Sequence, residues 1–241
     1  CSAIFSFLLF FIINGFTINL SLYSVLNSLL KSACGTSYAL IGYKIIARGG
    51  LAPYMLFLMS GGMAVPAVLG WIFLDEPFTL LRLFGVIVII SGIAVSNSDI
   101  KKMDKKLLLM CSAVFVLNGF VSLFSKLHQI NTEWGAVGTT DYVLIGCICG
   151  FLINMGTRLF TGRKKSAEAK VETPKKEKDL GFALKALLPV FIILLYSAVG
   201  NVSSFLQLEG AKNLPASVLY PLITGGSIVL SGVCDFLFFE E

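Results

Sequence analysis

Long apolar stretches separated by short polar turns dominate the chain. Five stretches carry no charged residue, and each is close to or above the roughly 18 residues that cross a bilayer core about 30 Å thick: residues 3–27, 49–74, 83–98, 107–125 and 186–207. Backbone amides in lipid must find partners within their own segment, so stretches of this length form helices. We therefore predict eight spans, at 2–20, 22–46, 51–74, 80–96, 107–127, 139–160, 182–208 and 216–239.

Composition supports a membrane protein and excludes an ordinary soluble domain. The chain is 56% hydrophobic and 14% charged, whereas a soluble domain carries about 25% charged residues. Its six cysteines lie in apolar surroundings without the spacing or companion histidines of a zinc site. No catalytic triad or nucleotide-binding glycine loop stands out either, so we expect a protein that is not an enzyme and holds no metal or cofactor.

Positive charge is concentrated in two linkers. Of the 19 Lys and Arg residues, four lie at 101–106 and seven at 163–178. Loops rich in these residues stay on the cytoplasmic side. We therefore predict a multi-pass plasma (inner) membrane protein whose basic loops, 97–106 and 161–179, are cytoplasmic. Charge placed in this way argues against nucleic acid as a partner and leaves the lipid bilayer as an expected partner.

An internal repeat links two distant segments at an offset of 164 residues. Residues 47–76 align without gaps on 211–240, and the identical pairs include Gly61 with Gly225, Gly62 with Gly226 and Glu76 with Glu240. Five predicted spans separate the two glutamates, and an odd number of crossings inserts the copies upside down relative to each other. Inverted repeats of this kind are typical of transporters that bind substrate near the midplane and work by alternating access.

The same segments resemble a known family. Gly61-Gly62 followed by Pro66, the run from Trp71 to Pro77, and the run from Leu83 to Gly92 resemble the end of an EamA-type repeat of the drug/metabolite transporter superfamily. Residues 220–226 and 238–241 resemble the second repeat. The resemblance implies an all-α integral membrane protein of ten helices in two inverted five-helix repeats.

On that template the chain divides into three parts. Residues 1–98 are expected to be helices two to five of the first repeat, residues 99–106 a basic cytoplasmic linker, and residues 107–241 helices six to nine of the second. We therefore expect about eight of the ten helices, in a fragment that lacks the first and the last.

Polar and aromatic residues inside the spans are the candidates for substrate binding. They are Asn118, Tyr196, Asn201, Ser204, Tyr220 and Thr224. The alternative is that such groups bridge one helix to another, a common role for polar side chains in lipid. Asp235, about one turn from the cytoplasmic end of the last span, is the candidate for coupling to a proton or another ion. A location at the membrane interface is its alternative. Glu76 and Glu240 are expected to cap a following helix rather than to carry protons.

Several other residues have predicted structural roles. We expect Gly61, Gly62, Gly225 and Gly226 to allow close helix packing, so that leucine at 225 and 226 would jam the helices. Lys31 and Lys126 lie near the outer face, where a lysine either extends its ammonium to the headgroups or, in a cavity, attracts an anionic substrate. Asp141 is predicted to lie in water at the outer start of its span.

These features predict a secondary transporter of a small organic metabolite or drug that works by alternating access. The alternative is a non-transporting polytopic membrane protein, either a lipid-handling protein or an assembly or signalling subunit. The sequence leaves the substrate, the coupling ion and a homodimer open.

Overall fold

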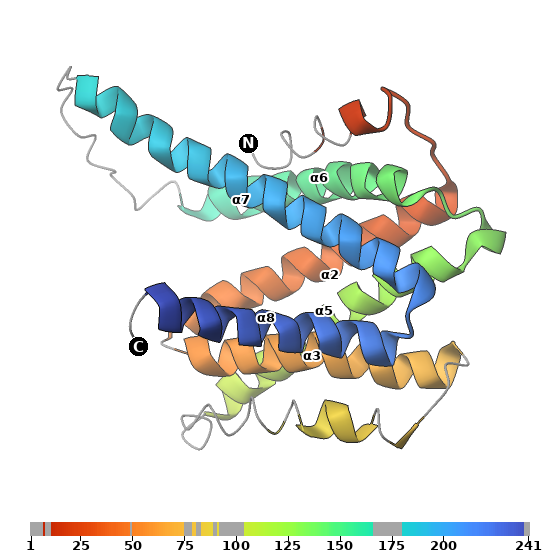
Figure 1. The fold of residues 1–241 in the computed structure, drawn as a ribbon. Coiled ribbons are helices and arrows are strands. Elements are labelled where there is room, and N and C mark those ends of the chain that lie inside the picture. The colour runs from red at the N-terminus through yellow and green to blue at the C-terminus, as the bar shows by residue number, and fades with distance from the viewer. Residues whose placement is uncertain are drawn as a thin grey trace. The chain divides into compact units, whose positions relative to one another are not determined.

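The computed structural model describes residues 7, 11–48, 50–74, 79–80, 83–88, 91, 104–165 and 180–238, which form helices and no strand (Figure 1). The helices are α2 (Leu22–Ile46), α3 (Leu51–Phe73), α5 (Lys105–Ile130), α6 (Thr139–Lys165), α7 (Leu180–Asn213) and α8 (Ala216–Phe238), with a short 3-10 helix, η2 (Thr132–Trp134). Residues 83–88 are also helical. The all-helical prediction is therefore confirmed for the part of the chain that the structure describes.

The first predicted span ends earlier in the structure than expected. Residues 11–13 are helical, but the chain turns at 14–16 instead of continuing to residue 20. Gly15 and Phe16 both have positive φ, at 65° and 61°. Consecutive left-handed residues cannot continue a right-handed helix, so the Asn14-Gly15 pair ends it.

Several helices have the length and character of membrane spans. Three are long and apolar enough to cross a bilayer, at Pro53–Phe73, Lys105–Ile130 and Thr139–Leu159, and Ala216–Leu230 is a shorter apolar helix. Large apolar side chains are exposed on these helices, among them Trp71, Phe73, Leu109, Leu152 and Leu159. Such surfaces suit lipid and are rare on soluble monomers. The chain is therefore a membrane-embedded helical protein.

The chain forms two compact units, each built from two segments. The first unit comprises Cys1–Leu29 with Val137–Leu206, and the second comprises Leu30–Ala136 with Gln207–Glu241. Both α2 and α7 begin in one unit and end in the other. Each unit draws on both of the predicted repeats, and the division of the sequence at 98 and 107 stays a prediction.

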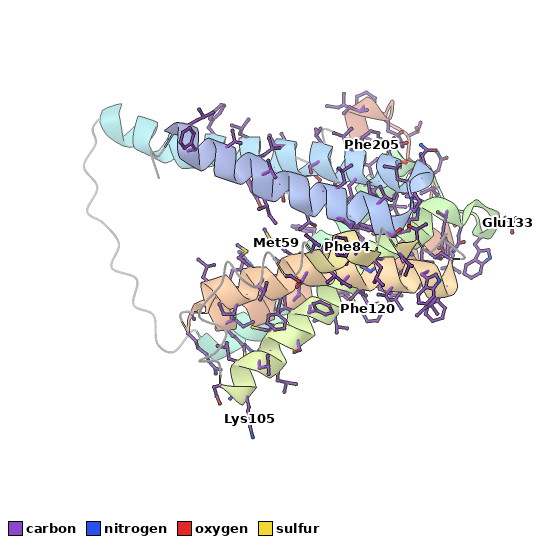
Figure 2. All side chains as sticks on the ribbon, turned by 60° about the horizontal axis from the view of Figure 1, so that its bottom comes forward. Met59, Phe84, Lys105, Phe120, Glu133 and Phe205 are labelled. Atoms are coloured by element: carbon purple, nitrogen blue, oxygen red, sulfur yellow. The ribbon has the colours of Figure 1, made fainter. Side chains whose placement is uncertain are left out.

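In the second unit, α3 packs against both α5 and α8, and Figure 1 shows α3 and α8 side by side. The core beside α3 and α5 contains Ile45, Tyr54, Cys111 and Val114. A second core, formed by Ala211, Ala216, Leu219 and Tyr220, joins the end of α7 to the start of α8. Figure 2 labels Lys105 at the start of α5 and Glu133 just beyond its end.

Contacts along α5 give the direction of α3. A Cβ added at Gly50, just before α3, would lie 3.5 Å from Leu107 near the start of α5. Gly61 of α3 lies against Phe115 of α5. Val65, one turn further along α3, lies against Gly119, one turn further along α5. Because residue numbers rise together in both helices, α3 runs in the same direction as α5.

The contacts of α8 run the other way. Leu214, just before α8, accepts a hydrogen bond from Lys126 near the end of α5, whereas Tyr220 in α8 bonds to Ser122, one turn earlier in α5. α8 is therefore antiparallel to α5, and hence antiparallel to α3 as well (Figure 1).

Candidate functional site

The last third of α5 is polar although it is buried. The buried residues in the first half of α5 include Cys111 and Val114, but those near its end are mostly polar or charged: Ser122, Ser125, Lys126, His128 and Gln129. We call these five residues the polar end of α5. Polar and ionisable groups enclosed in a membrane bundle are costly and commonly serve function, so this is the candidate functional site.

Lys126 is the charged residue of this site. Its side chain is 4% exposed. Its ammonium donates hydrogen bonds to the carbonyl oxygens of Ala211, at 2.8 Å, and Leu214, at 2.6 Å. These oxygens lie at the C-terminal end of α7, where carbonyls lack partners within the helix and carry partial negative charge. The prediction that Lys126 extends to the headgroups is wrong, because the end of α7 provides its oxygen ligands.

His128 extends the same basic environment. Its ring is buried, and its Nδ1 lies 3.2 Å from Nε2 of Gln129. Lys31 and Lys212 both lie within electrostatic range of the ring. Lys212 also forms an ion pair with Glu209 at 2.7 Å. The polar end of α5 is therefore surrounded by more positive than negative charge among these residues.

Two of the predicted substrate-binding residues join helices around α5. The side-chain amide of Asn118 donates to the carbonyl oxygen of Leu58 in α3 at 2.7 Å. The buried hydroxyl of Tyr220 in α8 donates to the carbonyl oxygen of Ser122 at 2.5 Å. Both contacts fit the alternative role of bridging helices. Thr224 is half-buried one turn beyond Tyr220, and its carbonyl oxygen accepts from Ser227 at 2.8 Å.

The other three predicted substrate-binding residues lie in the part of α7 that belongs to the first unit. Tyr196 is 79% exposed, as a lipid-facing aromatic side chain would be. Asn201 donates to the carbonyl oxygen of Ser197 at 2.7 Å, and its Oδ1 lies 3.9 Å from Sγ of Cys147 in α6. Ser204 is exposed and bonds back to the carbonyl oxygen of Gly200 at 2.9 Å. Three of the six predicted substrate-binding residues therefore belong to each unit.

The repeat glycines differ in their surroundings. A Cβ at Gly61 would overlap backbone atoms of Phe115, and one at Gly62 would lie 2.6 Å from Nδ2 of Asn118. At Gly226, no described atom outside its own helix lies within 4 Å of an added Cβ. Close packing is therefore present at Gly61 and Gly62. At Gly226, an added Cβ would meet no described neighbour that could produce the expected clash. Gly225 lies beside it in α8, half-buried.

The three carboxylates with predicted capping or coupling roles lie outside the side chains that the structure describes. Glu76 and Glu240 lie outside the described residues, and Asp235 is part of α8 but its side chain is not among those described. Their predicted capping and coupling roles therefore stay predictions.

The structure gives Asp141 a role that the sequence analysis missed. This carboxylate is 5% exposed in the first turn of α6. Its Oδ1 accepts from Nδ2 of Asn14 at 2.6 Å and from the backbone N–H of Asn19 at 3.2 Å, and its Oδ2 accepts from Nδ2 of Asn19 at 2.9 Å. Asp141 therefore fastens residues 14–19 to the start of α6, and the prediction that it lies in water is wrong.

A signal for the polar end of α5 is present in the sequence. Asn118, Ser122, Ser125 and Gln129 recur every three or four residues, the spacing that places side chains on one face of a helix. Lys126 adjoins this face. A search for polar periodicity within apolar spans would have identified the stripe, although not its partners.

Within the described residues, no group of three His, Cys, Asp or Glu side chains is arranged to hold a metal ion. Comparison with known proteins gives no match among family models, curated proteins or solved structures.

Proposed function

We propose that this chain is a secondary transporter that moves a small organic metabolite or drug across a plasma (inner) membrane by alternating access, in the manner of EamA-type transporters. The observation that carries the proposal is the opposite course of α3 and α8 along α5. These are the helices of the two segments that the internal repeat aligns, so their directions bear on whether the repeat is inverted.

The turns that precede the two helices support the same proposal. Gly50 and Leu214 are equivalent positions at the offset of 164 residues. Gly50 lies near Leu107 and Leu214 is bound to Lys126, positions that are 19 residues, or about 28 Å, apart along α5. Equivalent turns at opposite ends of one helix are what an inverted repeat requires, and inverted repeats favour alternating access at a site between them.

Transport is tested by flux through the full-length protein in reconstituted vesicles. Vesicles are loaded with a panel of radiolabelled amino acids, organic acids, organic cations and nucleosides. Release is compared with that from equally loaded vesicles that contain no protein. We expect saturable release of at least one class. Release equal to that from protein-free vesicles for every class would contradict transport and would favour the non-transporting alternative.

Coupling is tested by Asp235→Asn in the same vesicles. If the Asp235 carboxylate carries the coupled proton, the asparagine amide that replaces it cannot do so. Flux driven by a pH gradient is then expected to disappear. Exchange of substrate for substrate, with no pH gradient imposed, serves as the control and should persist. Gradient-driven flux that is unchanged in Asp235→Asn would exclude this residue as the proton carrier.

A further inference from the structure

The end of α7 is fastened to α5 by a buried charge. α7 ends at Asn213, and α8 begins at Ala216 after two intervening residues. Lys126 reaches this joint from α5 and binds the carbonyl oxygens of Ala211 and Leu214. Hydrogen bonds from a charged donor are roughly twice as strong as those between neutral groups. Lys126 therefore fastens the joint between α7 and α8 to α5 through two hydrogen bonds from a charged donor.

The equivalent joint at the other end of α5 has no such bond among the described residues. The turn before α3 approaches α5 through the side chain of Leu107 next to Gly50, and through a 3.7 Å contact between the guanidinium of Arg48 and the thioether of Met110. A thioether is a weak acceptor, and the Arg48 contact is exposed. The two repeat-related joints are thus fastened unequally.

We infer that Lys126 is a positioning residue that locks the α7–α8 joint onto the end of α5 and so keeps that end of the second unit closed. As a step in transport, the lock rests on the proposed function, because alternating access requires one end of the bundle to open while the other is closed. On the proposed orientation, Lys126 closes the outer end, and its release from Ala211 and Leu214 accompanies outward opening.

The lock can be tested without any substrate. Leu219 is buried in the core that Ala211, Ala216 and Tyr220 form at the joint, so Leu219→Cys places a smaller thiol where a membrane-impermeant maleimide reaches it only after the joint opens. Labelling is followed at residue 219 by peptide-resolved mass spectrometry in intact vesicles, which separates it from the native cysteines. Asn213→Cys, which is exposed at the same joint, gives the rate for an open position.

Lys126→Met removes both hydrogen bonds and is expected to raise the labelling rate at residue 219 by about tenfold or more. Hydrogen bonds from a charged donor are strong enough to favour the closed joint over the open joint by at least that factor. Lys126→Arg keeps a cationic donor within reach of the carbonyls, and should stay within about threefold of the unmodified rate. Lys212→Met is the matched control, since it removes the same charge from the same end but breaks an exposed ion pair within α7, with Glu209, instead of the bonds from α5.

The outcomes separate the lock from the transport function. Unchanged labelling in Lys126→Met, or equal increases in Lys126→Met and Lys212→Met, overturns the lock whatever the flux. Faster labelling in Lys126→Met alone, in a protein without flux, upholds the lock and counts against transport. If Lys126→Met is not recovered as a monodisperse protein, Lys126→Gln takes its place. Labelling of Leu219→Cys as fast as Asn213→Cys, with Lys126 intact, also overturns the lock.

Discussion

Replacing Gly61 by alanine is expected to lower the free energy of unfolding by about 2 kcal/mol, within the range for overpacked interiors. The added Cβ would lie 2.6 Å from Cα of Phe115 and would overlap its carbonyl oxygen. These are backbone atoms of α5, so no side chain can rotate away and α3 and α5 must separate. The loss is measured by thermal or denaturant unfolding of the purified protein in detergent.

Gly226→Ala is the matched control for this substitution. Gly226 occupies the repeat-equivalent place of Gly62, next to that of Gly61, in a helix that is also 23 residues long, so the intrinsic helix propensity changes alike at both positions. No described atom outside its own helix lies within 4 Å of the new Cβ, and Gly226→Ala should leave stability unchanged or raise it by up to about 1 kcal/mol. Equal losses in both variants would show that backbone contact with Phe115 is not the cause.

This pair of glycines shows what the sequence could and could not predict. Identical Gly-Gly steps made both copies of the repeat look alike, and the pattern correctly indicated small residues at a helix interface for Gly61 and Gly62. Whether another backbone lies against the second step depends on tertiary packing, which a local pattern does not contain. The sequence therefore predicted the kind of contact, and the structure shows it at Gly61 and Gly62 but at Gly226 places no described neighbour within 4 Å of an added Cβ.

Helix positions were more predictable, because the length of an apolar run follows directly from the requirement that lipid-embedded amides be paired. The bounds predicted for α2 match the structure, and those for α3 differ by one residue. The first span failed at Asn14 because hydropathy ignores backbone dihedrals. A turn with positive φ at Gly15 and Phe16 was signalled only by the Asn-Gly pair.

The two charges near the span ends were misread for a common reason. Lys126 and Asp141 were placed in headgroups or water because a charge near the end of an apolar run usually lies there. In the structure each meets groups of the sign it needs: Lys126 the carbonyl end of α7, and Asp141 the N–H groups of a distant loop beside the start of α6. Both partners are far away in sequence, so spacing along the chain could not reveal them.

Asp141→Ala is expected to detach residues 14–19 from α6 and to lower the free energy of unfolding by about 2–4 kcal/mol, since it removes three hydrogen bonds to a buried charged acceptor. Asn14 would keep its hydrogen bond to the carbonyl oxygen of Thr17. Water would satisfy the freed donors of Asn19, which is exposed, so no bond to Asp141 would hold the loop against α6. The same loss should speed hydrogen exchange at the backbone N–H of Asn19, which donates to Oδ1 of Asp141.

A double-mutant cycle separates the clamp from a general effect of removing a buried charge. In Asn14→Ala and Asn19→Ala the carboxylate keeps part of its hydrogen bonding, so each should cost less than Asp141→Ala. Asp141→Ala combined with Asn19→Ala should cost less than the sum of the two single losses, because the second substitution removes a partner already lost. Strict additivity, together with an unchanged exchange rate at Asn19 in Asp141→Ala, would show that Asp141 does not hold the loop. The expected non-additivity would instead show that the Asp141 carboxylate attaches residues 14–19, where the first predicted span ends, to the start of α6.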